Sequence, residues 1–151
     1  KTGKKVDFSM SNYGGIRAAI TKGNVTVSNA FELMPFDNTL VVVELNYEKI
    51  KELFAYFMSK NMAHPLSSHI ELKIKNKSYN VLISGKSIDK DKTYFVATSN
   101  YLQKGGDAMN FFKDPLSLYD SNFLIRDAIV EYFKSQDTLI SNLDNRVIIS
   151  N

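Results

Sequence analysis

Alternation of apolar and polar residues predicts a β-hairpin near the middle of the chain. Residues 70–74 alternate Ile, Leu and Ile with Glu and Lys, which is typical of a strand with one wet face. The alternation resumes over residues 79–83 after a short turn at Asn76 and Lys77. Upstream, apolar residues follow a helical spacing instead and predict a helix with one buried stripe. They are Ile50, Leu53, Phe54, Phe57 and Met58.

Runs of nearly continuous apolar residues predict further strands. Residues 39–45 are β-branched and almost wholly apolar, a pattern typical of a strand buried on both faces. Residues 94–98 have the same character, residues 6–10 indicate a short first strand, and residues 147–149 indicate a last one.

Capping residues predict two more helices. Ser28 or Asn29 is expected to cap a short helix through Leu33, with Glu32 reaching back towards the cap. Pro35 would end that helix, because the residue before a proline is driven out of the helical region. Asp120 or Ser121 is expected to cap a closing helix. Its core-facing residues at helical spacing would be Ile125, Ile129 and Phe133.

The order of elements indicates an α+β fold, in which a mixed β-sheet carries packed helices. We expect residues 1–151 to form a single domain, since no linker or repeat divides them. The chain is 44% hydrophobic and 23% charged, which excludes disorder as its main state. No apolar run approaches the roughly 18 residues that a membrane span needs, so no membrane span is expected. A formal charge of +3 gives no reason to expect nucleic acid, and the absence of cysteine excludes thiol chemistry.

Two loops with the same design are the main candidates for function. Each follows a predicted strand, contains a glycine pair and places a charged residue just beyond it. Glycines permit positive φ and a close approach of ligand to backbone. Arg17, after Gly14 and Gly15, offers a planar fork of donors suited to phosphate or carboxylate. Asp107, after Gly105 and Gly106, offers two acceptors suited to paired sugar hydroxyls.

Two aromatic residues are further candidates for binding a ligand. Phe36 and Tyr101 supply ring faces, and stacking of a base on such rings contributes about 1–3 kcal/mol. Each feature also has a plainer interpretation: a glycine pair as a simple turn, Arg17 as a surface arginine, and Phe36 as a core residue. Residue types and spacing alone therefore predict only that the chain binds something small.

Three ordered motifs make the chain resemble the C-terminal domain of the 5′-nucleotidase/UDP-sugar hydrolase/2′,3′-cyclic phosphodiesterase family. They are NYGGIR at residues 12–17, PFDN at 35–38 and NYLQKGGD at 100–107. GNVT at 23–26 and KTYFVA at 92–97 resemble connecting stretches of the same family, so the likeness spans nearly the whole chain.

The resemblance implies a nucleoside or nucleotide ligand and a role for each motif residue. Arg17 would contact the phosphate, and Asn12 would lie near the base or ribose. The base would stack between Phe36 and Tyr101, with Asn38 at its edge, and Asp107 would accept from ribose hydroxyls. The glycines that would shape the two loops are Gly14, Gly15, Gly105 and Gly106.

Some positions depart from the family pattern. Tyr101 and Ala108 stand where the family usually has Phe and Gly, and Ser67-Ser-His69 stands where a glycine is common. The altered residue at 108 is expected to stiffen or reshape its loop.

The resemblance also implies that catalysis resides elsewhere. In this family two divalent metals and the catalytic residues belong to an N-terminal metallophosphatase domain, which we expect to be absent from this chain and supplied in cis or in trans. We accordingly predict no catalytic or metal-binding residues and no cofactor here; His64 and His69 are expected to be structural or solvent-exposed. Family habit implies a periplasmic or extracellular location.

Three hypotheses follow. In the first, the chain is the substrate-recognition part of a nucleotidase-type phosphohydrolase. In the second, it is a non-catalytic binding or interaction module that retains the fold. In the third, it binds nucleic acid, which only the mild excess of basic residues supports. The ordered motifs favour the first.

Overall fold

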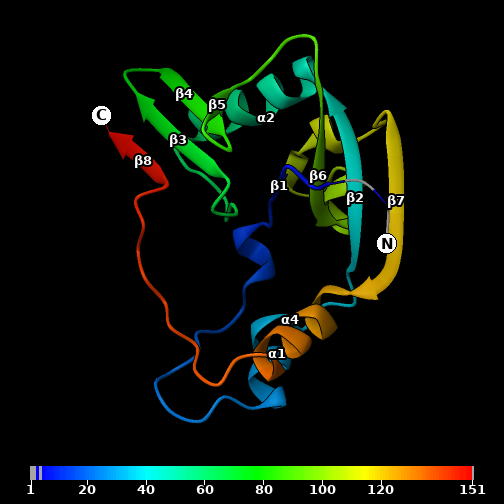
Figure 1. Ribbon diagram of the computed structural model, residues 1–151, viewed down its shortest axis with the longest axis vertical. Coiled ribbons are helices and arrows are strands. Elements are labelled where there is room, and N and C mark those ends of the chain that lie inside the picture. The colour runs from blue at the N-terminus through cyan, green and yellow to red at the C-terminus, as the bar shows by residue number, and fades with distance from the viewer. Residues whose placement is uncertain (1–2, 4, 151) are drawn as a thin grey trace.

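The computed structural model describes residue 3 and residues 5–150, so the outermost residues of the predicted 1–151 domain lie outside it. Within this part the strands form two four-stranded sheets (Figure 1). The first has the order β1 (Phe8–Ser9), β6 (Thr93–Ser99), β2 (Thr39–Asn46) and β7 (Ser117–Leu124). The second has the order β5 (Lys86–Ser87), β4 (Ser78–Ile83), β3 (Ile70–Lys75) and β8 (Val147–Ser150).

Each sheet is mixed, which confirms the predicted α+β class. β1 pairs with β6 and β8 pairs with β3 in parallel, whereas the other neighbours are antiparallel. The expectation of one sheet was wrong, because strand signals along a sequence do not reveal which strands pair.

Helix α2 (Tyr47–Lys60) packs against both sheets and confirms the prediction made from its apolar stripe. Its buried residues Ile50, Leu53, Phe54 and Phe57 are fully enclosed in one core shared by the two sheets. Asn46 caps the helix by accepting from the Lys49 backbone N–H at 3.0 Å. This helix therefore joins the second sheet to the first, whose strands β1, β6 and β2 adjoin the candidate loops.

Strand β2 is buried on one face only. Val41, Val43 and Leu45 enter the core, whereas Leu40 and Val42 are half-buried on the other face. The prediction of burial on both faces was wrong in this respect, although the strand itself is confirmed.

The hairpin of β3 and β4 lies as predicted, with Ile70, Leu72 and Ile74 facing the core. Asn76 and Lys77 both have positive φ, 49° and 57°, as a two-residue hairpin turn requires. Strand β6 and the shortened strand β1 also match their predictions.

Helix α1 (Val27–Leu33) begins earlier than predicted. Thr26 is its N-cap, and the Thr26 backbone N–H donates to Asn29 Oδ1 at 2.8 Å. Asn29 thus plays the reciprocal part that the sequence analysis gave to Glu32, and neither Ser28 nor Asn29 is the cap. The helix ends before Pro35, as expected.

The predicted cap at Asp120 or Ser121 was wrong, because both residues lie in strand β7. Thr39 Oγ1 donates to Asp120 at 3.2 Å, and Ser121 Oγ donates to the Leu40 carbonyl at 2.6 Å. Helix α4 (Ile125–Lys134) starts directly after this strand and packs against α1 at the lower end of the molecule (Figure 1). Its residues Ile125, Ile129 and Phe133 are half-buried.

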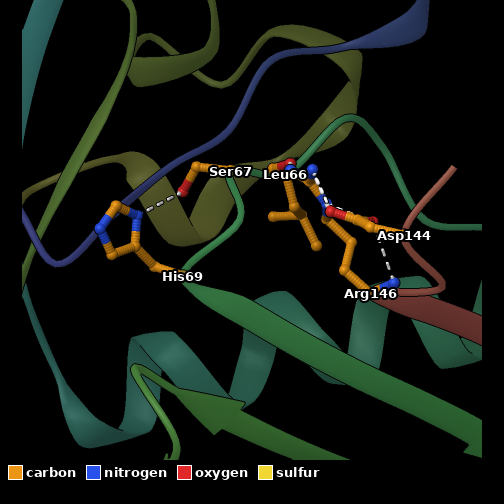
Figure 2. A network of polar contacts seen from close by, with 5 residues as sticks. All are labelled: Leu66, Ser67, His69, Asp144 and Arg146. Atoms are coloured by element: carbon orange, nitrogen blue, oxygen red, sulfur yellow. Dashed lines mark hydrogen bonds and ion pairs between the residues drawn. The ribbon is translucent and has the colours of Figure 1, made fainter. Parts of the chain in front are cut away.

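The chain returns from α4 along one side of the molecule to β8, which confirms the predicted last strand (Figure 1). Arg146 pairs with Asp144 and donates from Nη1 to the Leu66 carbonyl at 3.0 Å (Figure 2). The neighbouring Ser67 backbone N–H donates to the Ser9 carbonyl at 2.9 Å. The segment with the altered Ser67-Ser-His69 sequence thus connects β8 to the strand that leads into the first glycine loop.

Candidate functional site

The first glycine loop follows β1 and forms a 3₁₀ turn, η1 (Tyr13–Gly15). A hydrogen bond holds its backbone: the Tyr13 N–H donates to His64 Nδ1 at 3.1 Å. Gly15 is buried, and a Cβ there would lie 3.0 Å from the Asn12 side-chain oxygen. The pair Gly14 and Gly15 has no positive φ, so space for the Asn12 side chain is the requirement here, not an unusual backbone conformation.

The second glycine loop follows β6 and the single turn α3 (Asn100–Gln103), then forms η2 (Gly106–Ala108). Gly105 has φ 88°, a conformation for which glycine is suited. Gly106 provides space instead, because a Cβ there would lie 2.4–2.6 Å from atoms of the Tyr101 ring. Ala108 keeps a left-handed φ of 60°, so the backbone adopts a glycine-like conformation at some energetic cost.

The two loops meet at Asp107. Asn12 Nδ2 donates to Asp107 Oδ2 at 2.7 Å, across 95 residues of sequence, and the Tyr101 hydroxyl donates to Oδ1 at 2.8 Å. The Tyr56 hydroxyl of α2 donates to the Asp107 carbonyl at 3.0 Å. Asn12 itself is buried, whereas Asp107 is exposed. The carboxylate is therefore fixed in position and still open to solvent.

The PFDN turn lies beside the second loop. The Thr39 backbone N–H, one residue past the turn, donates to Asn100 Oδ1 at 3.2 Å, next to Tyr101. Phe36 and Tyr101 remain 41% and 42% exposed, so both rings keep accessible surface. The plain interpretation of Phe36 as a core residue is thereby wrong. Asn38 is half-buried, and its carbonyl accepts from the Ile125 N–H at 2.9 Å.

Arg17 is exposed at the end of the first loop. Its backbone N–H donates to the Leu33 carbonyl at 2.9 Å, which ties the loop to the end of α1 just before Pro35. One guanidinium N–H approaches the Gly14 carbonyl at 3.5 Å. All ten predicted residues thus belong to three segments that are hydrogen-bonded directly or through α1 to one another.

Sequence reasoning did not connect three supporting residues to the candidate site, although the structural or solvent-exposed role that it predicted for His64 is confirmed as a structural one. Tyr56 donates a hydrogen bond to the second glycine loop, and His64 accepts one from the first. Arg126, at the start of α4, pairs with Asp37 at 2.9 Å and lies 4.3 Å from the centre of the Phe31 ring. No local signal marks these three, since a tyrosine off the apolar stripe, a lone histidine and one arginine are all common surface residues.

Two titratable groups of the site are perturbed. Burial lowers the pKa of His64, and the nearby Asp107 charge opposes that effect. The hydrogen bond to Asp107 raises the pKa of Tyr101, because the bond is lost when the phenol ionises. His64 contacts the rings of Tyr13, Tyr56 and Phe57, with centroids 5.7–6.2 Å apart.

The described surface also has a hollow outside the three predicted segments. The hollow, of about 970 Å³, lies between residues 20–27 and 130–141 and contains none of the predicted residues. In the described part of the chain no three His, Asp or Glu side chains lie close enough to hold a metal ion. Nor does any helix of residues 5–150 have the length and apolar character of a membrane span.

These features define a domain that exposes two aromatic rings, an arginine and a fixed carboxylate on three segments linked by hydrogen bonds. The chain belongs to the family described as 5′-nucleotidase, C-terminal domain, whose sequence profile matches residues 1–114. The resemblance drawn from the three motifs is thereby confirmed.

Individual relatives agree with this assignment. Protein UshA of Yersinia enterocolitica is 28% identical over 137 residues, covering 88% of this chain and 25% of its own length. The trifunctional nucleotide phosphoesterase YfkN of Bacillus subtilis is 30% identical over 149 residues, covering 89% of this chain and 10% of its own. The chain therefore spans a quarter or less of these curated relatives.

A solved structure extends the likeness beyond the profile. The 5′-nucleotidase precursor of Thermus thermophilus superposes with a TM-score of 0.85 at 26% identity, over 97% of this chain and 32% of its own. The similarity includes most of residues 115–150, which form β7, α4 and β8, so these elements belong to the same fold.

Proposed function

We propose that this chain is the substrate-recognition domain of a 5′-nucleotidase-type phosphohydrolase and binds a nucleoside or nucleotide. The observation that carries the proposal is the exposed carboxylate of Asp107, fixed by Asn12 and Tyr101 next to an exposed ring. Membership of the 5′-nucleotidase C-terminal family supports the same assignment.

Each group on the open face suits one part of a nucleotide. The base stacks between Phe36 and Tyr101, with Asn38 at its edge, and Asp107 accepts from the ribose hydroxyls. Arg17 offers its planar fork of donors to the phosphate. Asn12 acts on the ligand through Asp107, because its amide is buried and donates to that carboxylate.

Catalysis requires a second, metal-bearing domain. We expect a metallophosphatase domain with two divalent metals, in cis or in trans, to activate the water that attacks phosphorus. The greater length of the relatives leaves room for such a domain in each of them. By the same likeness we place the protein in the periplasm or outside the cell.

The test is a calorimetric titration of the chain with adenosine and with AMP. AMP should bind more tightly than adenosine, and Arg17→Gln should reduce the affinity for AMP alone. Phe36→Ala should weaken both ligands by about tenfold, the loss of one stacking face. Lys22→Gln and Tyr132→Ala, exposed residues outside the three segments, serve as matched controls.

The contrary result is equally clear. If neither ligand binds at millimolar concentration, or if Phe36→Ala and Arg17→Gln leave both affinities unchanged, nucleotide recognition by this face is wrong. The chain would then be a non-catalytic interaction module that retains the fold.

A further inference from the structure

The hydroxyl of Tyr101 both donates a hydrogen bond to Asp107 and accepts one from it. It donates to Asp107 Oδ1 at 2.8 Å, and its oxygen accepts from the Asp107 backbone N–H at 3.3 Å. Asp107 has left-handed dihedrals, φ 53° and ψ 28°, a conformation that is uncommon for non-glycine residues and least so for residues such as aspartate. The hydroxyl thus contributes to both the backbone conformation and the side-chain orientation of Asp107.

The ring of Tyr101 is fixed by the same loop. It lies directly against Gly106, where a Cβ would approach ring atoms to within 2.4–2.6 Å, and it still exposes 42% of its surface. The Tyr101 ring and the Asp107 carboxylate are therefore held together as one unit. In a nucleoside the base and the sugar are joined at a fixed distance, so such a unit holds a stacking surface and a sugar acceptor at a set offset.

The carboxylate keeps acceptor capacity after these bonds are made. An ionised carboxylate has about four acceptor positions, and one protein donor is bonded to each oxygen. Asp107 is exposed, so its remaining positions are available to a ligand. Two neighbouring hydroxyls can bond to one carboxylate at once, whereas a sugar that lacks one of them leaves an acceptor without its partner.

We infer that the Tyr101 hydroxyl is a specificity-determining group, which orients Asp107 before the ligand arrives and so selects ribose over deoxyribose. This inference rests on the proposed function. Orientation in advance favours the diol because less freedom is lost when it binds. Tyr101→Phe keeps the stacking ring and removes only the hydroxyl, so it separates the two roles of this side chain.

The experiment compares adenosine with 2′-deoxyadenosine by calorimetry in wild type, Tyr101→Phe and Tyr132→Phe. Wild type should prefer adenosine by about tenfold, as expected for one hydrogen bond to a charged acceptor. In Tyr101→Phe the preference should fall to about twofold, while the affinity for 2′-deoxyadenosine stays within about twofold because stacking persists. Tyr132→Phe, an exposed tyrosine on α4, should retain the wild-type preference.

An independent measurement checks the hydrogen bond without ligand. NMR titration of Tyr101 should show a pKa above the ordinary value of 10.0 in wild type, returning towards it in Asp107→Asn. Identical titrations in the two proteins would mean that the bond is absent, and the inference would be wrong.

The outcomes distinguish a failure of this inference from a failure of the proposed function. If wild type binds neither nucleoside, the proposed function fails and the inference fails with it. If wild type binds nucleosides in a Phe36-dependent way, the function stands. Then an unchanged preference in Tyr101→Phe, equal losses for both ligands, or no preference in wild type overturns the inference alone.

Discussion

At the residue scale, His64 couples the first glycine loop to pH. Its Nδ1 accepts from the Tyr13 N–H, so this nitrogen must be unprotonated for the bond to exist. The ring is buried among Tyr13, Tyr56 and Phe57, and burial holds the pKa of His64 below the ordinary 6.5. Below that pH the unfolded chain binds more protons than the folded one, so stability falls as the pH is lowered towards the folded pKa.

We therefore predict that the melting temperature falls between about pH 7.5 and about pH 5 and that His64→Gln reduces this fall, since the window spans the ordinary histidine pKa. Glutamine can still accept from the Tyr13 N–H but does not titrate. Thermal melts by circular dichroism across this range make the measurement. His69→Gln, which changes the exposed second histidine, should keep the wild-type behaviour. Equal pH dependence in His64→Gln and wild type would contradict the assignment.

The residues that sequence reasoning found are those with a distinctive chemical character. Asp107, Arg17 and Tyr101 lie in the two loops that contain glycine pairs, and Phe36 follows a proline. The structure places these residues on three connected segments. Tyr56 was missed, and the structural or solvent-exposed role predicted for His64 did not connect it to the first glycine loop. Both contacts span 51 residues of sequence, which no local pattern records.

At the scale of elements, α4 contacts the PFDN turn through a hydrogen bond and an ion pair. The Ile125 N–H donates to the Asn38 carbonyl, and Arg126 pairs with Asp37 while its guanidinium covers the Phe31 ring. The Arg126 side chain is 10% exposed, whereas that of Asp37 is 80% exposed. The helix thus contacts the two residues that follow Phe36, which are Asp37 and Asn38, and the ring of Phe31 in α1.

We predict that Arg126→Met lowers the free energy of unfolding by about 1–2 kcal/mol, through loss of the ion pair and of the cation–π contact. Chemical denaturation measures this change, and amide hydrogen exchange at Ile125 should quicken as the turn loosens. Lys134→Met removes an exposed cation from the same helix and should leave both quantities unaltered. Unchanged exchange at Ile125 in Arg126→Met would show that the turn does not depend on this residue.

Elements with a periodic apolar face were predictable, and those without one were not. Helix α2 and the β3–β4 hairpin each bury one face, and the periodicity of that face is visible in the sequence. Strand β7 is largely exposed and pairs through its backbone with β2, so Asp120 and Ser121 looked like helix caps. The division into two sheets also had no local signal, since it depends on which strands meet in space.

At the scale of the molecule, the candidate site is a face and not an enclosed cavity. Phe36, Tyr101, Arg17 and Asp107 are all exposed, and the 970 Å³ hollow lies elsewhere. A nucleotide on such a face keeps one side open to solvent. A second domain placed over that side would surround the phosphate, and the curated relatives, of which this chain spans a quarter or less, leave room for one.

The last prediction concerns chemistry by this chain alone. We expect the purified chain to bind AMP without releasing phosphate in the presence of Mn²⁺ or Zn²⁺, because hydrolysis needs a metal-bound water. The described residues offer no cluster of three metal-ligating side chains. EDTA should accordingly leave the affinity for AMP within about twofold, since we propose that Arg17, and not a metal, contacts the phosphate. A phosphate-release assay is made in parallel on full-length Thermus thermophilus 5′-nucleotidase to show that the conditions support hydrolysis.

Phosphate release that copurifies with the chain and is abolished by EDTA would contradict the division of labour between the two domains. Such a result would mean that this chain holds a metal site of its own.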